Sequence, residues 1–109
     1  MYINDLDNLL AKDLTSQIVW GDYGSNRSHL IQQGNLVQFQ LANGVAMPIG
    51  GKVLCTLPVV PIQPFWVQVM DGANGNPNGF AFVDVHGTVT MTLETSQNYA
   101  RIFGVFVCR

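Results

Sequence analysis

Charged side chains are scarce in this sequence. Asp, Glu, Lys and Arg make up 11% of its 109 residues, against about 25% in a typical globular domain. The formal net charge is −2, and the five lysines and arginines are scattered along the chain. Nucleic-acid binding needs clustered basic side chains, so we expect no nucleic-acid partner. So few charges also suggest that much of the surface is covered in an assembly, or that the protein works outside the cell.

Long apolar runs and paired cysteine motifs are also absent. No run approaches the ~20 apolar residues of a membrane-spanning helix, and Met1–Asp5 lacks the basic start of a secretion signal. We therefore expect a soluble chain with no membrane insertion and no secretion signal of its own. Cys55 and Cys108 fit no metal or redox spacing. Each lies in an apolar run, where a free cysteine packs as a small hydrophobe; a disulfide between neighbouring strands is the alternative.

What the sequence does contain is strict alternation, clearest in residues 79–93. Side chains change face at every residue of a strand, so this stretch predicts two strands joined at His86-Gly87, where glycine accepts a positive φ. One face of the hairpin is expected to build a core and the other to display Asp84, His86 and a threonine row. The core-facing residues are Ala81, Val83, Val85, Val89, Met91 and Leu93.

Short strand patterns separated by turns occupy most of the remaining chain. Residues 57–64 carry three prolines and are expected to run extended along an edge, whereas residues 71–79 form a long turn. Such spacing predicts an all-β fold, a small antiparallel β-barrel or sandwich of one domain. Strands are expected at 18–20, 29–32, 36–41, 52–57, 65–70, 79–86, 88–93 and 101–108.

Residues 3–18 alone predict a helix. Their apolar residues recur at spacings of three and four, and Asn4 can cap the first turn. The stripe either packs on the domain's own sheet or belongs to a multi-chain helical stalk. The expected organisation is an N-terminal helix over residues 1–18 and a β-domain over residues 19–109. The stripe consists of Ile3, Leu6, Leu10, Leu14 and Ile18.

The closing strand is apolar on both faces. Ile102, Phe106 and Cys108 alternate with Phe103, Val105 and Val107. In so short a chain, burial of both faces requires a second subunit. The sequence therefore predicts a homo-oligomer.

Catalytic and metal-binding patterns are weak. Asp84 and His86 share a face, but the Gly-x-Ser-x-Gly signature that would present a nucleophile is missing. His29 and His86 have no metal-ligand spacing, and the loop at residues 71–79 lacks the closing glutamate of a calcium loop. We expect no enzyme activity, no metal site and no cofactor.

Aromatic and planar polar side chains favour a saccharide site instead. The flat face of an aromatic ring packs against a sugar ring, and planar polar groups bind its hydroxyls. For Trp66, which lies in an apolar strand, a core position is the alternative interpretation. The candidate saccharide-binding residues are Asp84, His86, Trp66, Tyr23, Tyr99 and Arg101.

Three motifs follow one another in a set order: Gly34-Asn-Leu-Val-Gln-Phe39, the proline segment 57–64, and Phe82-Val-Asp-Val-His-Gly-Thr-Val-Thr90. With the closing strand, they resemble the head domain of receptor-binding proteins from long-tailed phages of lactic-acid bacteria. The resemblance covers roughly residues 20–109. It implies a β-barrel head in a homotrimer at the tail or baseplate tip of the virion. It also implies contacts with other baseplate or tail proteins, and host cell-wall saccharide bound in clefts between subunits.

A saccharide motif of that family runs His-x-Asp, a glycine turn, then Trp on the returning strand. Asp84 matches its carboxylate and Gly87 its turn, whereas Phe82 stands at the histidine and Met91 or Thr92 at the tryptophan. The resemblance implies a phage adhesin that recognises host saccharide, and it favours the stalk interpretation of the N-terminal helix. The alternative is a structural oligomeric β-domain of a baseplate or fibre that binds no carbohydrate.

Overall fold

A computed structural model of the protein describes residues 10–109. In this part of the chain nine strands form one antiparallel sheet, and a short 3-10 helix, η1 (Thr15–Gln17), follows the first strand. The strands are β1 (Lys12–Asp13), β2 (Val19–Trp20), β3 (His29–Gln33), β4 (Leu36–Ala42), β5 (Gly50–Thr56), β6 (Phe65–Asp71), β7 (Pro77–Val83), β8 (Thr88–Leu93) and β9 (Ala100–Val107).

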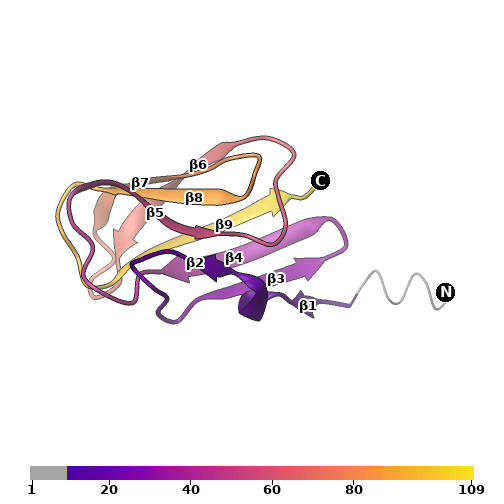
Figure 1. Ribbon diagram of the computed structural model, residues 1–109, viewed down its shortest axis with the longest axis horizontal. Coiled ribbons are helices and arrows are strands. Elements are labelled where there is room, and N and C mark those ends of the chain that lie inside the picture. Colours follow the sequence, from indigo (N-terminus) through magenta and orange to yellow (C-terminus); the bar gives the residue numbers. More distant parts are fainter. Residues whose placement is uncertain (1–9) are drawn as a thin grey trace, which may run out of the picture.

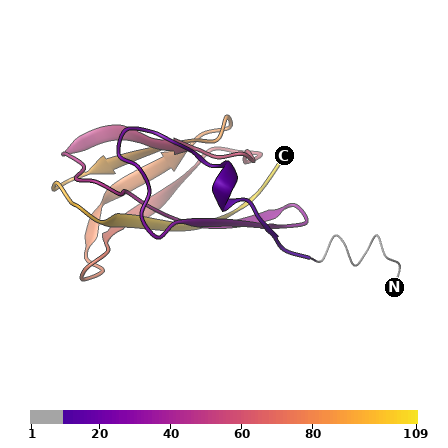
Figure 2. The same ribbon diagram turned by 60° about the horizontal axis from the view of Figure 1, so that its bottom comes forward.

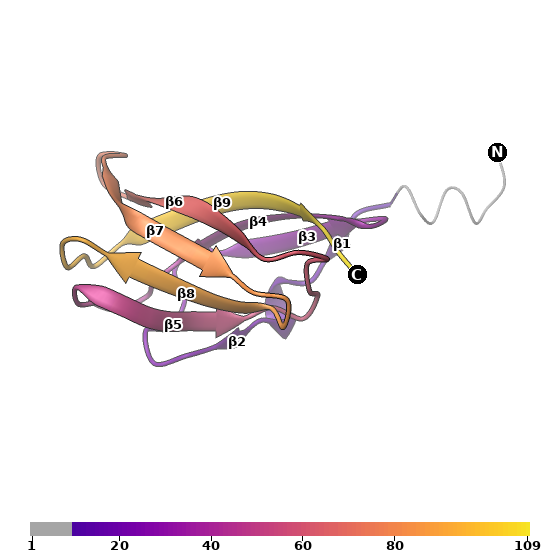
Figure 3. The same cartoon turned by 90° about the horizontal axis from the view of Figure 1, so that it is seen from above.

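The strand order is β1-β3-β4-β9-β6-β7-β8-β5-β2 (Figure 1). Seen from above, this order runs across the whole molecule (Figure 3). The sheet curls into a half-barrel; β9 lies in one wall, and β5 and β8 lie in the other (Figure 2). The all-β prediction is confirmed. None of the helices in residues 10–109 is long and apolar enough to cross a membrane.

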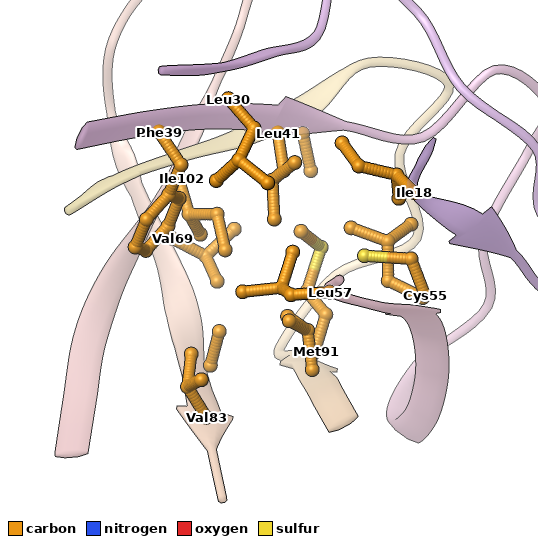
Figure 4. Close-up of a cluster of buried hydrophobic side chains, with 14 of the residues drawn as sticks. Ile18, Leu30, Phe39, Leu41, Cys55, Leu57, Val69, Val83, Met91 and Ile102 are labelled. Atoms are coloured by element: carbon orange, nitrogen blue, oxygen red, sulfur yellow. The ribbon is translucent and has the colours of Figure 1, made fainter. Parts of the chain in front are cut away.

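Because the sheet curls, every second side chain along a strand points into the interior of the half-barrel. The core draws residues from both walls, including Leu30, Leu41, Val69, Met91 and Ile102 (Figure 4). β6 and β9 pair only at Met70↔Arg101 and Asp71↔Ala100. Beyond that point the two strands are joined by side chains, because the rings of Phe39, Phe65 and Phe106 lie 5.5–6.2 Å apart across the interior.

The predicted hairpin is formed by β7 and β8. Ala81 pairs with Met91 and Val83 with Val89, and all four side chains are fully buried. The turn contains Gly87 at φ +84°. The alternation seen in the sequence is therefore the division between the inside and the outside of the half-barrel.

The closing strand has one buried face and one exposed face within the single chain, and the predicted second subunit stays a prediction. Ile102 and Phe106 are buried, whereas Phe103, Val105 and Val107 are 45%, 63% and 40% exposed. The second apolar face of β9 therefore lies on the outside of the half-barrel, where no part of residues 10–109 covers it.

The predicted helix over residues 3–18 is wrong where the structure describes it. Residues 10–18 contain β1 and η1 but no α-helix, and residues 3–9 lie outside the described part. Lys12 pairs with Gln32, and the Thr15 hydroxyl accepts the Leu30 N–H at 2.9 Å. Here hydrogen bonds to the distant strand β3 replace the local ones of a helix, and tertiary contacts routinely override helix propensity in this way. The stripe is also split, because Leu10 is exposed while Ile18 is buried.

Other boundaries also differ from the sequence prediction. The strand expected over residues 79–86 ends at Val83, so Val85, expected to face the core, lies in the turn and is only half-buried. β7 begins at Pro77, inside the stretch expected to be a turn, and its register with β6 shifts between Gln68 and Met70. The proline segment 57–64 forms no strand. It crosses the end of β9 through a Pro61↔Cys108 bridge and a hydrogen bond from Ile62 N–H to the Val107 carbonyl.

Two buried asparagines hold the loops at one end of the half-barrel. Asn78 donates to Asp71 Oδ1 and to the Thr95 carbonyl, and it accepts N–H groups from Glu94 and Thr95. Asn43 donates to the carbonyls of Val45 and Gln97 and accepts the Ala100 N–H at 2.7 Å. Both are at most 2% exposed. Because their side-chain amides are hydrogen-bonded, their burial leaves no polar group without a partner.

Candidate functional site

An exposed aromatic surface lies on the outside of β6 and β7. The Trp66 side chain is 63% exposed, and it pairs across strands with Phe82. Its ring centroid lies 4.4 Å from that of Phe82 and 5.1 Å from that of Phe80, the latter pair meeting edge to face. We call Trp66, Phe80 and Phe82 the aromatic surface. Of the two interpretations of Trp66, the core position is therefore wrong.

The threonine row lies beside this surface on β8. Thr92 pairs with Phe80 and Thr90 with Phe82, so hydroxyl groups border the aromatic rings along the neighbouring strand. The row consists of Thr88, Thr90 and Thr92, and all three side chains are half-buried. An outer face built from flat rings and hydroxyls can pack against an apolar surface and exchange hydrogen bonds at the same time.

Asp84 lies in the turn that follows Phe82. Its Oδ1 accepts the N–H groups of His86 at 2.9 Å and Thr88 at 3.0 Å, and its own N–H bonds the Thr88 carbonyl. One carboxylate oxygen therefore holds the turn closed, which leaves Oδ2 for a ligand. The His86 side chain is exposed at the tip, and it meets Asp84 only through its main chain.

The other candidate residues lie elsewhere. Arg101 pairs with Met70, at the opposite end of β6 from Trp66, and Tyr99 lies just before β9. Tyr23 packs against the core from the loop after β2, and its carbonyl accepts the N–H groups of Gly44 and Val45. The structure therefore brings Trp66, Asp84 and His86 to one side and Tyr99 and Arg101 to another, and it places Tyr23 against the core.

A second exposed surface covers the outside of β3, β4 and β9. Leu36 pairs with Val107, Gln38 with Val105 and Gln40 with Phe103. A groove of about 140 Å³ runs along it, lined by Ile31, Gln33, Leu36, Val37, Gln38 and Val105. We call Leu36, Phe103, Val105 and Val107 the aliphatic surface, since branched side chains dominate it.

Neither metal nor thiol chemistry is supported in residues 10–109. No group of three His, Cys, Asp or Glu side chains in this part could hold a metal ion. Cys55 and Cys108 are free and buried, so the disulfide alternative is wrong. Burial raises the pKa of the Cys55 thiol to about 12, which keeps it protonated and unreactive at neutral pH.

Sequence reasoning found Trp66 and Asp84 but missed the support that Phe80 and Phe82 give the tryptophan. The sequence does indicate that Trp66 is exposed. Trp66 and Gln68 alternate with Phe65, Val67 and Val69, and a polar glutamine is expected on the solvent side of the strand, which puts Trp66 on that side as well. Comparison with family models, curated proteins and solved structures gives no match to this chain.

Proposed function

We propose that this chain is a saccharide-binding adhesin domain, acting as the head of a phage receptor-binding assembly of the kind its motifs resemble. The observation that carries the proposal is the large exposed fraction of Trp66, whose ring is held by two phenylalanines. An indole fixed in this way presents a flat apolar face to solvent. Exposed apolar patches of this kind commonly mark interaction sites.

The neighbouring groups suit a sugar more than a protein helix or a lipid. The apolar face of a pyranose ring stacks on the indole, while Thr90 and Thr92 offer hydroxyls that donate and accept. The carboxylate of Asp84 adds an ionised acceptor, whose hydrogen bonds are stronger than those between neutral groups. Asp84 is also the position that matches the carboxylate of the family motif.

The proposal is tested by binding of host cell-wall polysaccharide and by a glycan array. We expect Trp66→Ala to weaken binding at least tenfold, about 1.4 kcal/mol, with an unchanged melting temperature. Phe103→Ala is the control, because it removes another exposed aromatic ring, 45% exposed against 63% for Trp66, from the aliphatic surface. Full binding by Trp66→Ala would move the site away from β6, and loss in both variants would implicate assembly instead.

A second function is favoured by the aliphatic surface. Its side chains are apolar and carry no directional groups, which suits burial against another protein. In this alternative the chain is a structural oligomeric domain of a baseplate or fibre, without carbohydrate binding. Under the adhesin proposal the same surface joins the subunits of a homotrimer. Light scattering measures the oligomer, and a trimer that binds no glycan would favour the structural function.

A further inference from the structure

A glutamine lies on the same outer face as the aromatic surface. Gln68 follows Trp66 by two residues on β6 and pairs with Phe80 on β7, so its side chain lies on the same face as both rings. It is exposed. The strands β6, β7, β8 and β5 lie side by side in this part of the sheet (Figure 3). The Trp66 ring therefore has a carboxamide as its next neighbour along the strand.

A β-bulge fixes the orientation of this carboxamide. The register between β6 and β7 shifts between Gln68 and Met70, where Gly79 adopts φ +84°. Gln68 Nε2 donates to the Gly79 carbonyl at 3.0 Å and to the Val69 carbonyl at 3.4 Å. β-bulges are over-represented next to active sites, where they redirect a side chain. With its nitrogen bound at the bulge, the carboxamide holds its oxygen in one direction.

The oxygen of the carboxamide is the group left for a ligand. Gln68 Oε1 forms no hydrogen bond within residues 10–109, and a carboxamide oxygen accepts but does not donate. An acceptor that is already oriented binds a donor at a lower entropic cost than a freely rotating side chain does. The fixed Oε1 therefore suits a hydroxyl group of a ligand.

A second acceptor lies on the opposite side of the Trp66–Phe82 pair. Phe80, Phe82 and Asp84 take alternate positions along β7 and into its turn, and Asp84 Oδ2 forms no hydrogen bond within the part of the chain that the structure describes. Four residues of extended chain, roughly 13 Å, separate Asp84 from Phe80, the partner of Gln68. This distance leaves room for a pyranose ring on the indole, with a hydroxyl edge toward each acceptor.

No cation accompanies these acceptors on the outer face. Lys52 is the single basic residue of the strands β5 to β8. It pairs with the buried Met91 and so belongs to the other face of the sheet. A carboxylate or phosphate on the ligand would therefore approach the Asp84 carboxylate without a positive charge from these strands between them, and such a juxtaposition of like charges is unfavourable.

We propose that Gln68 is a specificity-determining residue of the aromatic surface and that the ligand is a neutral saccharide. The inference rests on the proposed function for the site, and it names the class of sugar. The ring lies on Trp66, one hydroxyl donates to Gln68 Oε1, and a second hydroxyl on the opposite edge donates to Asp84 Oδ2. A site built to hydrogen-bond a hydroxyl group discriminates against an analogue that lacks it.

The first experiment follows the Trp66 indole N–H signal by NMR while methyl pyranosides of glucose, galactose and mannose are added. For the tightest binder, each hydroxyl is removed in turn by deoxygenation or blocked by O-methylation. We expect a position at which both changes weaken binding about fivefold, as loss of one neutral hydrogen bond does. In Gln68→Met, which keeps the length of the side chain but not its amide, the parent sugar should bind about fivefold more weakly, and the discrimination at this position should disappear.

Gln38→Met is the matched control, since Gln38 is also exposed on the outside of a strand but lines the groove beside the aliphatic surface. It should keep the native affinity and discrimination. Discrimination that survives in Gln68→Met would overturn the proposal. Weak binding of the deoxy sugar with full binding of the O-methyl sugar would also overturn it, because the hydroxyl would then accept a hydrogen bond. Each pair of sugars is compared within one variant, so a change in its stability does not enter the result.

The second experiment tests the class of sugar. Binding of the tightest methyl pyranoside is compared with binding of its uronic acid at constant ionic strength. We expect the neutral sugar to bind severalfold more tightly, and we expect Asp84→Asn to narrow the difference because it removes the negative charge. Equal or tighter binding of the uronic acid to the native protein would overturn the assignment of a neutral ligand.

The adhesin proposal and this inference fail in different ways. Native binding by Trp66→Ala, or no response to any of the sugars, would reject the adhesin proposal and the inference with it. Binding that depends on Trp66 but not on Gln68 would reject the inference alone and leave the adhesin proposal standing.

Discussion

The two exposed apolar surfaces differ in what they can recognise. The aliphatic surface of β4 and β9 is built from branched side chains and Phe103, with glutamines between them. The aromatic surface of β6 and β7 is built from three rings beside a row of threonines. Branched side chains fill space against another packed surface, whereas a fixed flat ring beside hydroxyls selects the shape of a smaller ligand.

This difference shows that exposed apolar area alone does not indicate whether a surface binds a protein or a smaller ligand. Both surfaces lie on one curled sheet and share one core, and they follow from the same alternation along the strands. Their distinction lies in side-chain shape and in the polar groups that border them. We therefore propose assembly for the aliphatic surface and ligand binding for the aromatic surface, and the following changes test that proposal.

The largest effect is expected for Gly79→Ala, which should abolish both surfaces together. Gly79 has φ +84°, and an added Cβ would overlap the Thr92 carbonyl oxygen. Backbone strain and this clash together should cost more than about 3 kcal/mol of unfolding free energy. Gly75→Ala is the control, since Gly75 has φ +73° but no atom within 4 Å of the added Cβ. Urea unfolding of both variants measures the difference, and equal losses would contradict the clash.

Phe103→Asp should disrupt assembly while the fold of the single chain survives. Because Phe103 is half exposed, the charge stays hydrated in the monomer, where surface substitutions cost about 0.5 kcal/mol. Burial of that charge between subunits should weaken association by about 3 kcal/mol or more. Light scattering and a melting curve on the same sample measure both. Ile49→Asp adds the same charge at an exposed site outside both surfaces and should leave the oligomer intact. If the oligomer also dissociates in this variant, the added charge alone, and not its position at Phe103, weakens association.

Asp84→Ala should have a moderate effect on both stability and binding. It removes the acceptor of the His86 and Thr88 N–H groups, at about 1–2 kcal/mol of unfolding free energy, and should weaken saccharide binding by about 1.5–3 kcal/mol. Asp84→Asn keeps an Oδ1 acceptor for the turn but removes the charge. We expect it to restore the melting temperature and to bind saccharide weakly. Full binding by both variants would remove Asp84 from the site.

The smallest effect concerns Asp13, which lies on the edge strand β1 and belongs to neither surface. Hydrogen bonds from the Thr15 hydroxyl, and then from the Thr15 N–H, hold the pKa of Asp13 below its ordinary value of 3.8. The folded state therefore binds this proton less readily than the unfolded chain. Its stabilisation is present above the unfolded pKa and is lost as the pH falls through the lowered folded pKa. Urea midpoints between pH 2 and 6, as a rough range around the model carboxyl pKa, should depend less on pH in Asp13→Asn; an identical slope would contradict this.

Period-two patterns made much of the fold predictable. The hairpin of β7 and β8 and the two faces of β9 follow directly from which residues alternate, because each strand has one side in the core. The N-terminal segment could not be predicted in this way. A spacing of three and four suits a helix locally, but the free edge of β3 offered Leu14 and Thr15 partners that lie far away in the sequence.

The candidate site was predictable only in part. Trp66 and Asp84 stand out in the sequence as residue types that bind ligands. Their distance from Arg101 depends on the curvature of the sheet, and local sequence patterns do not predict that curvature. Arg27 in the loop after β2 lies over the ring of Tyr99, just before β9, and Asn78 joins β7 to the loop after β8. Such contacts depend on chain closure across the whole domain, so the sequence did not predict them.

The position of β9 sets the order in which the protein can fold. This strand comes last in the sequence, yet it lies between β4 and β6 in the middle of the sheet. During synthesis the β3–β4 hairpin and the β6–β8 meander can each pair locally, but no strand pairing joins β4 to β6 until β9 is present. The wait for so distant a pairing slows folding and leaves two half-sheets with open edges at the ribosome.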